Sequence, residues 1–252
     1  MECGDIDLAQ LLKRQSLHAL SENHIRLYWQ QMLEAVQVIH NHRIVHGDLK
    51  PANFLFVEGR LKLIDFGIAK TIREDHTSAY RDSQAIVGTL NYMSPEAIQG
   101  TEIHSLNPNE PSKTCVKLGP SSDIWSLGCI LYAMVYGKTP FQHITMPIKK
   151  MQAIIDDQYE IKFPDIYNEF LLDVLHNCLK RKPTERLTIR QLLQHPFLHP
   201  SASQKNIFLR TPKNDKQLKD VVKRYLLSQS HTPRTAEKIS QDLIKKLHEP
   251  SI

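Results

Sequence analysis

The sequence predicts a mainly α-helical fold, a helical bundle that carries one short β-hairpin. Apolar residues recur at every third or fourth position in several segments, which is the period of an amphipathic helix. Only one pair of short β-type runs flanks a glycine turn, so a single hairpin is expected. Residues 122–136 are apolar on nearly all sides, a pattern that predicts a buried central helix.

Two helices are expected in the first 40 residues. Asp5 or Asp7 can cap a short helix that reaches Leu12, because a carboxylate at this position accepts from the first backbone N–H groups. Ser21 can cap a longer helix in the same way. The apolar residues of that longer helix follow helical spacing: Ile25, Tyr28, Met32, Val36 and Ile39. A short strand is expected at residues 43–46.

The hairpin pairs residues 54–57 with residues 61–64 through a turn built on residues 58–60. Gly59 supplies the positive φ that a tight hairpin turn requires. After the hairpin, residues 65–91 and 99–120 are polar and lack periodicity. Both stretches are predicted to be irregular, and loops of this length inside a compact domain are usually functional or disordered.

Three further helices are predicted near residues 148–156, 170–180 and 188–194. Gly137 suits the position that ends the central helix. Thr188 and Gln191 form a capping box at the start of the last helix. Residues 214–227 and 235–247 show two more helical patterns. We therefore expect a domain at residues 1–200 and a helical tail at residues 201–252.

Composition excludes several classes of protein. The net charge is +5, and the 32 Lys and Arg residues are spread along the chain, so direct nucleic-acid binding is not expected. A mild attraction to anionic partners stays open. The four cysteines show no C-x-x-C spacing, no signal peptide is visible, and the longest apolar run, residues 129–136, is too short to span a bilayer. An intracellular protein without membrane contact is expected.

Three short motifs carry the chemistry. They are residues 46–53 (HGDLKPAN), residues 65–67 (DFG) and residues 94–96 (SPE). In this order, around a predicted hairpin, they resemble the signature of protein kinases, with Gly47 in place of the usual arginine and Ser94 in place of alanine. Each motif alone is weak, and their joint order gives the specificity. The resemblance implies the C-terminal lobe of the kinase fold.

The residue types suit phosphoryl transfer, which needs positioning and charge neutralisation more than covalent chemistry. Asp48 can accept the proton of an attacking hydroxyl, and Lys50 can meet the γ-phosphate of ATP as a point charge. Asn53 and Asp65 offer oxygens to Mg²⁺, which prefers few protein ligands together with phosphate oxygens. By resemblance, Thr89 bridges Asp48 and Lys50.

Two structural roles follow from the resemblance. Asp123 opens a D-x-W-x-x-G run (residues 123–128) and would hold the backbone of the catalytic loop. Arg186 would pair with the Glu96 carboxylate. The plainer alternatives are an ordinary acid in the first turn of a helix for Asp123 and a surface arginine for Arg186.

The beginning of the sequence resembles a kinase hinge. Met1 then occupies the gatekeeper position, the backbones of Glu2 and Cys3 face adenine, and Leu55 forms the floor under the ring. For Cys3 an ordinary terminal thiol is the alternative. The sequence contains no glycine-rich phosphate loop and no V-A-I-K lysine. We expect these parts to precede Met1, so that this chain represents the large lobe without the N-terminal β-lobe.

Residues 1–4, 53–68 and 128–142 resemble the TTK or monopolar spindle kinase family. This resemblance implies a Ser/Thr kinase that also accepts Tyr, uses ATP and Mg²⁺, and acts on protein substrates in the mitotic spindle checkpoint. It further implies a nuclear, kinetochore location with kinetochore or spindle partners. Thr77 and Ser78 are candidates for autophosphorylation, with plain solvated residues as the alternative. A lobe that binds partners without transferring phosphate is the alternative function.

Overall fold

The computed structural model describes residues 6–14, 20–65, 70–71, 90–102, 118–166, 168–199 and 237–238. Contacts divide the chain into two compact units, residues 1–16 with 20–199 and residues 17–19 with 200–252. In the second unit, residues 237–238 are helical. The rest of the two predicted tail helices lies outside the described residues.

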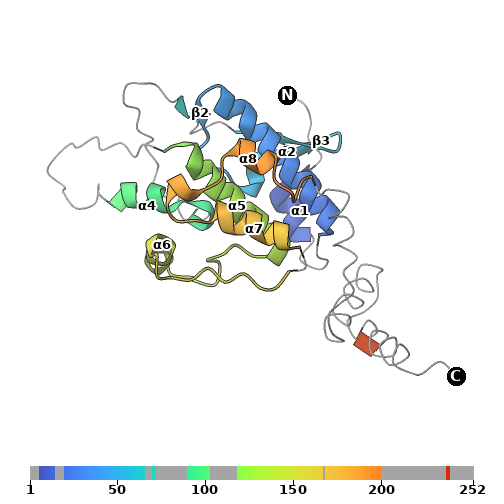
Figure 1. Cartoon of the computed structure of the whole chain (residues 1–252). Coiled ribbons are helices and arrows are strands. Elements are labelled where there is room, and N and C mark those ends of the chain that lie inside the picture. Colours follow the sequence, from blue (N-terminus) through green and yellow to red (C-terminus); the bar gives the residue numbers. More distant parts are fainter. Residues whose placement is uncertain are drawn as a thin grey trace. The chain divides into compact units, whose positions relative to one another are not determined.

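The first unit is mainly helical, as the sequence predicts (Figure 1). Its α-helices are α1 Leu8–Arg14, α2 Glu22–Asn41, α4 Pro95–Glu102, α5 Pro120–Tyr136, α6 Pro147–Ile155, α7 Glu169–Cys178 and α8 Ile189–Leu193. Its strands are β1 Ile6–Asp7, β2 Ile44–Val45, β3 Phe54–Val57, β4 Arg60–Leu63 and β5 Lys70–Thr71. Short 3₁₀ turns are η2 Pro51–Asn53, η4 Leu90–Tyr92 and η6 Pro183–Glu185.

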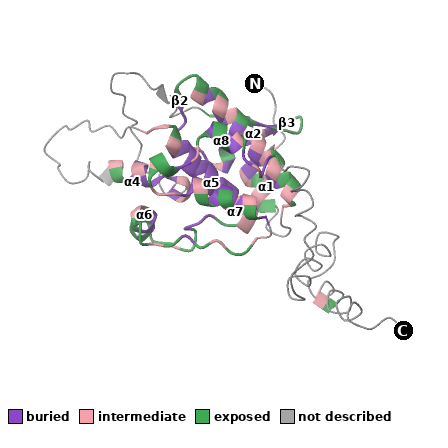
Figure 2. Ribbon diagram, in the orientation of Figure 1, coloured by how far each residue is buried: buried purple, intermediate pink, exposed green. Residues whose placement is uncertain are grey.

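Helix α5 is the buried centre of this unit, and helices α2 and α7 pack on it (Figure 2). It begins with Pro120 at its first turn and ends at Gly137, whose φ of 71° is the left-handed conformation that closes many helices. Gly128 lets α7 approach closely, because a Cβ built on it would lie 2.6 Å from Cys178 Cβ. The prediction of a buried central helix is confirmed.

The predicted hairpin is confirmed, with its second strand starting one residue earlier. Strands β3 and β4 pair antiparallel with Phe54 opposite Leu63. Glu58 and Gly59 form the two-residue turn, and both have positive φ, 51° and 76°. This is the pattern of a type I′ turn, whose twist matches the strands that it joins.

Two strands, β1 and β5, are not predicted from the sequence and form by pairing with strands distant in the chain. Strand β1 adds to β3, with Ile6 opposite Phe56, and gives the sheet order β1-β3-β4. Strand β5 pairs with β2 inside the stretch 65–91 that we expected to be irregular. Two-residue strands carry no local period, so only the partner strand reveals them.

The helix caps agree with the sequence. Asp7 Oδ1 accepts from Gln10 N at 2.8 Å, so Asp7 caps α1, while Asp5 lies outside the described residues. Ser21 caps α2 by accepting from His24 N. The capping box of α8 is present in both directions between Thr188 and Gln191. Helix α1 continues to Arg14, two residues beyond the predicted end.

One irregular segment was predicted wrongly. Helix α4 runs to Glu102, so residues 99–102 are helical. Pro95 at the first helical position and Glu96 in the first turn are start signals for this helix. The helix also packs against α6, a contact that local sequence cannot show.

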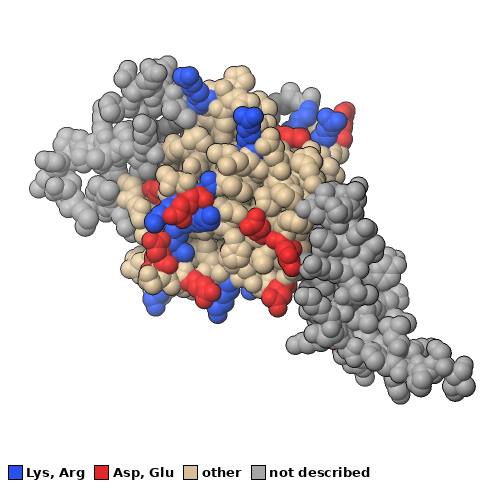
Figure 3. All heavy atoms as spheres, in the orientation of Figure 1, with Lys and Arg blue, Asp and Glu red and all other residues tan. Residues whose placement is uncertain are grey.

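Positive and negative side chains are interspersed on the face of the molecule shown in Figure 3, in agreement with the even spread of charge along the sequence. Within the described ranges, no helix is both long and apolar enough to cross a membrane.

Candidate active site

A small hollow lies beside Asp48. The catalytic-loop side of the hollow is formed by residues 47–49. The opposite side is formed by the segment that precedes α4 together with α4 and α5, through Tyr92, Met93, Ser94, Ala97, Ser122 and Ser126. Two of the three motifs therefore contribute to the lining of one hollow, the HGDLKPAN loop through residues 47–49 and the SPE segment through Ser94.

Asp123 fixes the loop that carries Asp48. Its carboxylate is fully buried and accepts from the backbone N–H groups of His46 and Gly47, at 2.9 and 2.8 Å. Its Oδ2 also lies 2.7 Å from His40 Nε2, which comes from the last turn of α2. Hydrogen bonds to an ionised acceptor are stronger than neutral ones, so the loop is attached firmly to α5.

Gly47 is needed for the shape of this loop. Its φ is 75°, in the left-handed region that residues with a Cβ rarely adopt. The same conformation aims its N–H at Asp123 Oδ1. A glycine in place of the usual arginine is thus part of the local backbone geometry.

Asp48 and Lys50 lie side by side. Lys50 Nζ donates to Asp48 Oδ2 at 3.0 Å, and the Asp48 side chain keeps 17% of its surface exposed. The Asp48 N–H donates to His46 Nδ1 at 3.2 Å. The carboxylate is therefore held in one place, next to a cation, and it can be reached from the hollow.

Asn53 and Asp65 fit a magnesium site in residue type, and the hairpin brings their backbones close, while Asn53 Oδ1 accepts from Lys50 N at 3.0 Å. Asn53 lies just before β3, and its carbonyl accepts from Ile64 N at 2.7 Å, which continues the hairpin by one step. Asp65 follows directly, is exposed, and has a φ of 63°. A non-glycine residue in this region is strained, and such strain collects at functional sites. Two oxygen ligands leave room for phosphate oxygens around a hard cation.

Leu55 fits the floor of an adenine site. It lies on β3 between Phe54 and Phe56, which are both buried in the core. Side chains alternate along a strand, so half-buried Leu55 lies on the face opposite to these two rings. On this face the residues paired with Leu55 are Asp7 of β1 and Lys62 of β4, so Leu55 is the apolar side chain between two charged neighbours.

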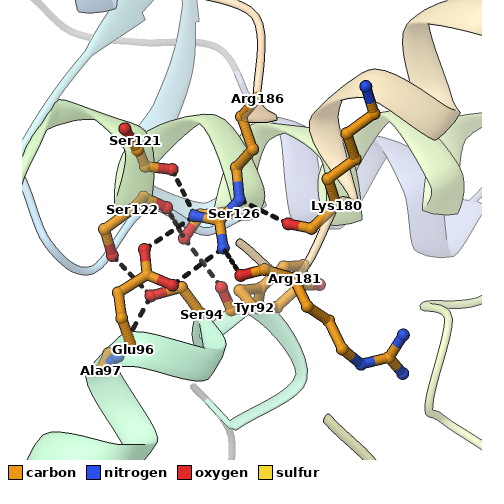
Figure 4. A network of polar contacts seen from close by, with 10 residues as sticks. All are labelled: Tyr92, Ser94, Glu96, Ala97, Ser121, Ser122, Ser126, Lys180, Arg181 and Arg186. Carbon is orange, nitrogen blue, oxygen red and sulfur yellow. Dashed lines mark hydrogen bonds and ion pairs between the residues drawn. The ribbon is translucent and has the colours of Figure 1, made fainter. Parts of the chain in front are cut away.

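The ion pair between Glu96 and Arg186 is formed, as the resemblance implies (Figure 4). Arg186 Nη1 and Nη2 donate to the two carboxylate oxygens of Glu96 at 2.7 and 2.8 Å. The three other N–H groups of the guanidinium donate to the carbonyls of Lys180, Ser121 and Arg181. All five donors are used, and the side chain is fully buried. The alternative interpretation of Arg186 as a surface arginine is therefore wrong.

Serine hydroxyls attach the SPE segment to α5 in the same view (Figure 4). The Ser94 and Ser122 hydroxyls lie 2.8 Å apart, and Ser126 Oγ donates to the Tyr92 carbonyl at 2.7 Å. Burial raises the pKa of the Tyr92 phenol to about 12, so this ring stays neutral at physiological pH. The wall of the hollow is thus bonded to the central helix at two points.

Some predicted site residues lie outside the described part of the chain. They are Glu2, Cys3, Thr77, Ser78 and Thr89. Two further features of the site, His40 and the Ser94–Ser122 contact, are not predicted from the sequence. The place of His40 in the last turn of α2, directly before the catalytic loop, is the one signal that could have found it.

The geometry is that of a protein kinase large lobe, and comparison with known proteins agrees. Residues 1–198 match the family described as "Protein kinase domain". The chain belongs to the protein kinase family.

Among curated relatives, the similarity points to one branch of this family. The fission yeast (Schizosaccharomyces pombe) serine/threonine-protein kinase mph1 is 51% identical over 221 residues, which cover 81% of this chain and 32% of the relative. The zebrafish (Danio rerio) dual specificity protein kinase Ttk is 57% identical over 199 residues, covering 79% of this chain and 19% of the relative. The chain thus spans a third or less of the length of these relatives.

Proposed function

We propose that the protein transfers the γ-phosphate of ATP to Ser and Thr, and also to Tyr, of protein substrates. The observation that carries this proposal is the placement of Asp48, which is held by Asp123 on one side of a hollow and accompanied by Lys50. The names of the relatives, which describe Ser/Thr and dual-specificity kinases, support the same reaction.

In this reaction Asp48 orients the substrate hydroxyl and accepts its proton as the new bond to phosphorus forms. Lys50 balances negative charge close to Asp48 and meets the phosphate being transferred. Asn53 and Asp65 hold the metal, and Leu55 supports adenine. Mg²⁺ bound with ATP supplies neutralisation of the phosphate charge.

A polypeptide substrate would lie along residues 92–94. These residues line the same hollow as Asp48, so a chain that presents its hydroxyl to Asp48 would pass close to them. A wall made by a run of consecutive residues suits a peptide better than a compact small molecule. This favours protein substrates over a small-molecule phosphotransferase.

On the resemblance to the TTK family we further propose a role in the mitotic spindle checkpoint. The protein would then work in the nucleus at kinetochores, with kinetochore or spindle proteins among its partners. The similarity to mph1 and Ttk over about four-fifths of the chain supports this assignment.

The reaction is tested with the protein at its full encoded length, incubated with ATP, Mg²⁺ and a mixed Ser/Thr/Tyr peptide library. Mass spectrometry should find phosphate on peptide hydroxyls, and EDTA should abolish the transfer. Asp65→Asn should also abolish it, since asparagine tolerates positive φ but lacks the charge that the metal requires. The matched control is Asp165→Asn, an exposed acid elsewhere on the unit. A wild-type protein without transfer would instead support the non-catalytic interaction module.

A further inference from the structure

Lys150 is an unusual residue of helix α6. Only 8% of its surface is exposed, and its Nζ donates to Asn91 Oδ1 at 2.6 Å. Asn91 belongs to η4, directly before the residues that line the hollow next to Asp48. The bond joins two segments that are 59 residues apart in the sequence.

The charge of Lys150 is not balanced by an acid. In the part of the chain that the structure describes, its ammonium group has a neutral amide as partner and forms no ion pair with a carboxylate. Buried lysines are rare unless they are paired, because removing the charge from water costs free energy. The cost is visible here, since desolvation lowers the pKa of Lys150. A hydrogen bond to the Asn91 amide does not require a charged donor. The contact therefore does not by itself explain why a cation is buried at this position.

The segment from Asn91 to Ser94 is held from both sides. On one side α5 binds it through the Ser126–Tyr92 and Ser94–Ser122 contacts. Helix α6 binds it through the Lys150–Asn91 bond, the one hydrogen bond between α6 and this segment among the described residues. If the second contact is lost, Asn91 is released while the attachment to α5 persists.

Helix α6, which carries Lys150, is held in place by hydrogen bonds from Arg181. Arg181 donates to the carbonyls of Ala153 and Ile154, which lie in the last turn of α6, at 3.1 Å each. The Arg181 carbonyl in turn accepts from Arg186, the partner of Glu96 (Figure 4). Hydrogen bonds through Arg181 and Arg186 therefore connect α6, which carries Lys150, to Glu96 at the start of α4.

We propose that Lys150 is a positioning residue for the protein substrate, which through Asn91 sets the wall of the hollow along which the substrate chain lies. This proposal rests on the kinase function proposed above. It assigns to α6 a part in substrate binding and none in the binding of ATP.

The test compares Lys150→Met with Lys149→Met in the protein at its full encoded length. Methionine keeps the apolar stem and removes the donor. Lys149 is the adjacent, exposed lysine, so its variant makes the same change in charge without the contact. Steady-state kinetics are measured with a peptide that the wild type phosphorylates, along with ATP hydrolysis in the absence of peptide and the thermal midpoint.

For Lys150→Met we expect the KM for the peptide to rise about tenfold, the size expected when a hydrogen bond to a charged group is lost. The KM for ATP and the rate of ATP hydrolysis without peptide should stay close to those of Lys149→Met. Lys150→Arg, which keeps a donor, should restore most of the loss. Asn91→Leu should raise the same KM, and combining it with Lys150→Met should add little, because both remove one bond.

Two results would overturn the proposal. A peptide KM for Lys150→Met equal to that of Lys149→Met would show that the contact does not serve the substrate. A lower thermal midpoint with an unchanged KM would assign Lys150 a structural role. A wild-type protein that phosphorylates no peptide would instead count against the proposed function itself.

Discussion

Gly47 shows how a single residue adapts the kinase loop in this chain. Its positive φ turns its N–H toward Asp123, and the neighbouring N–H of His46 joins it there. The side chain that most kinases carry at this position would require the left-handed conformation, which costs residues with a Cβ roughly 1–2 kcal/mol. Backbone geometry and the lack of the arginine are therefore linked.

Gly47→Ala should lower the free energy of unfolding by about 1–2 kcal/mol and also reduce phosphotransfer. The matched variant is Gly137→Ala, which alters a glycine of similar φ, 71°, at the end of α5. Denaturant titration should give similar losses of stability for both, since a Cβ meets no close contact at Gly137 and an ordinary one at Gly47. Equal activity of the two variants would contradict the role of Gly47 in the catalytic loop.

Site residues with a linear signature could be predicted from the sequence. Asp48, Asn53, Asp65 and Asp123 stand at fixed places in short motifs, and the structure puts all four around one loop and one hairpin. Lys150 could not be predicted, because a lysine in an amphipathic helix is normally solvated and only the fold brings it to Asn91.

At the scale of elements, α5 organises the site. It carries Asp123 for the catalytic loop and Ser122 and Ser126 for the opposite wall. The carbonyl of Ser121, in the first turn of α5, accepts from Arg186. Both walls of the hollow are thus bonded to α5. A helix buried on nearly all sides is a rigid support for the groups that it carries.

Arg186→Ala should lower the free energy of unfolding by about 3–5 kcal/mol, because the change strands Glu96 and leaves three carbonyls without their donor. The control is Lys182→Ala, which breaks an exposed pair with Glu185 whose side chains keep 69% and 52% of their surface exposed. That control should change stability by less than about 1 kcal/mol. Denaturant midpoints measure both, and equal effects would refute the view of Arg186 as the buried anchor of α4.

Helices were easier to predict than short strands, for a physical reason. Helix α2 spans many turns with clear periodicity and a cap at Ser21, and α5 is marked by a long run that is apolar on nearly all sides. Strands β1 and β5 have two residues each and exist through their partners. Helix α4 shows that a polar composition can hide a helix that packs against a distant element, here α6.

At the scale of the molecule, the described unit supplies most of the chemistry of one kinase site. Asp48, Lys50, Asn53, Asp65 and Leu55 all come from residues 48–65, and α4 and α5 contribute to the lining of the hollow beside Asp48. The site thus depends on a short stretch of sequence held by a large helical support.

The rate of phosphoryl transfer in a single turnover is the most direct test of the role of Asp48 in the proposed site. Wild type, Asp48→Asn and the exposed-acid control Asp157→Asn are compared at full encoded length with saturating ATP, Mg²⁺ and peptide. Asp48→Asn should slow transfer by roughly 10²-fold or more, the contribution of a positioned general base, with unchanged affinity for ATP. Asp157→Asn should match the wild type. A rate for Asp48→Asn within a few-fold of the wild type would contradict the assignment of Asp48 and, with it, the proposed site.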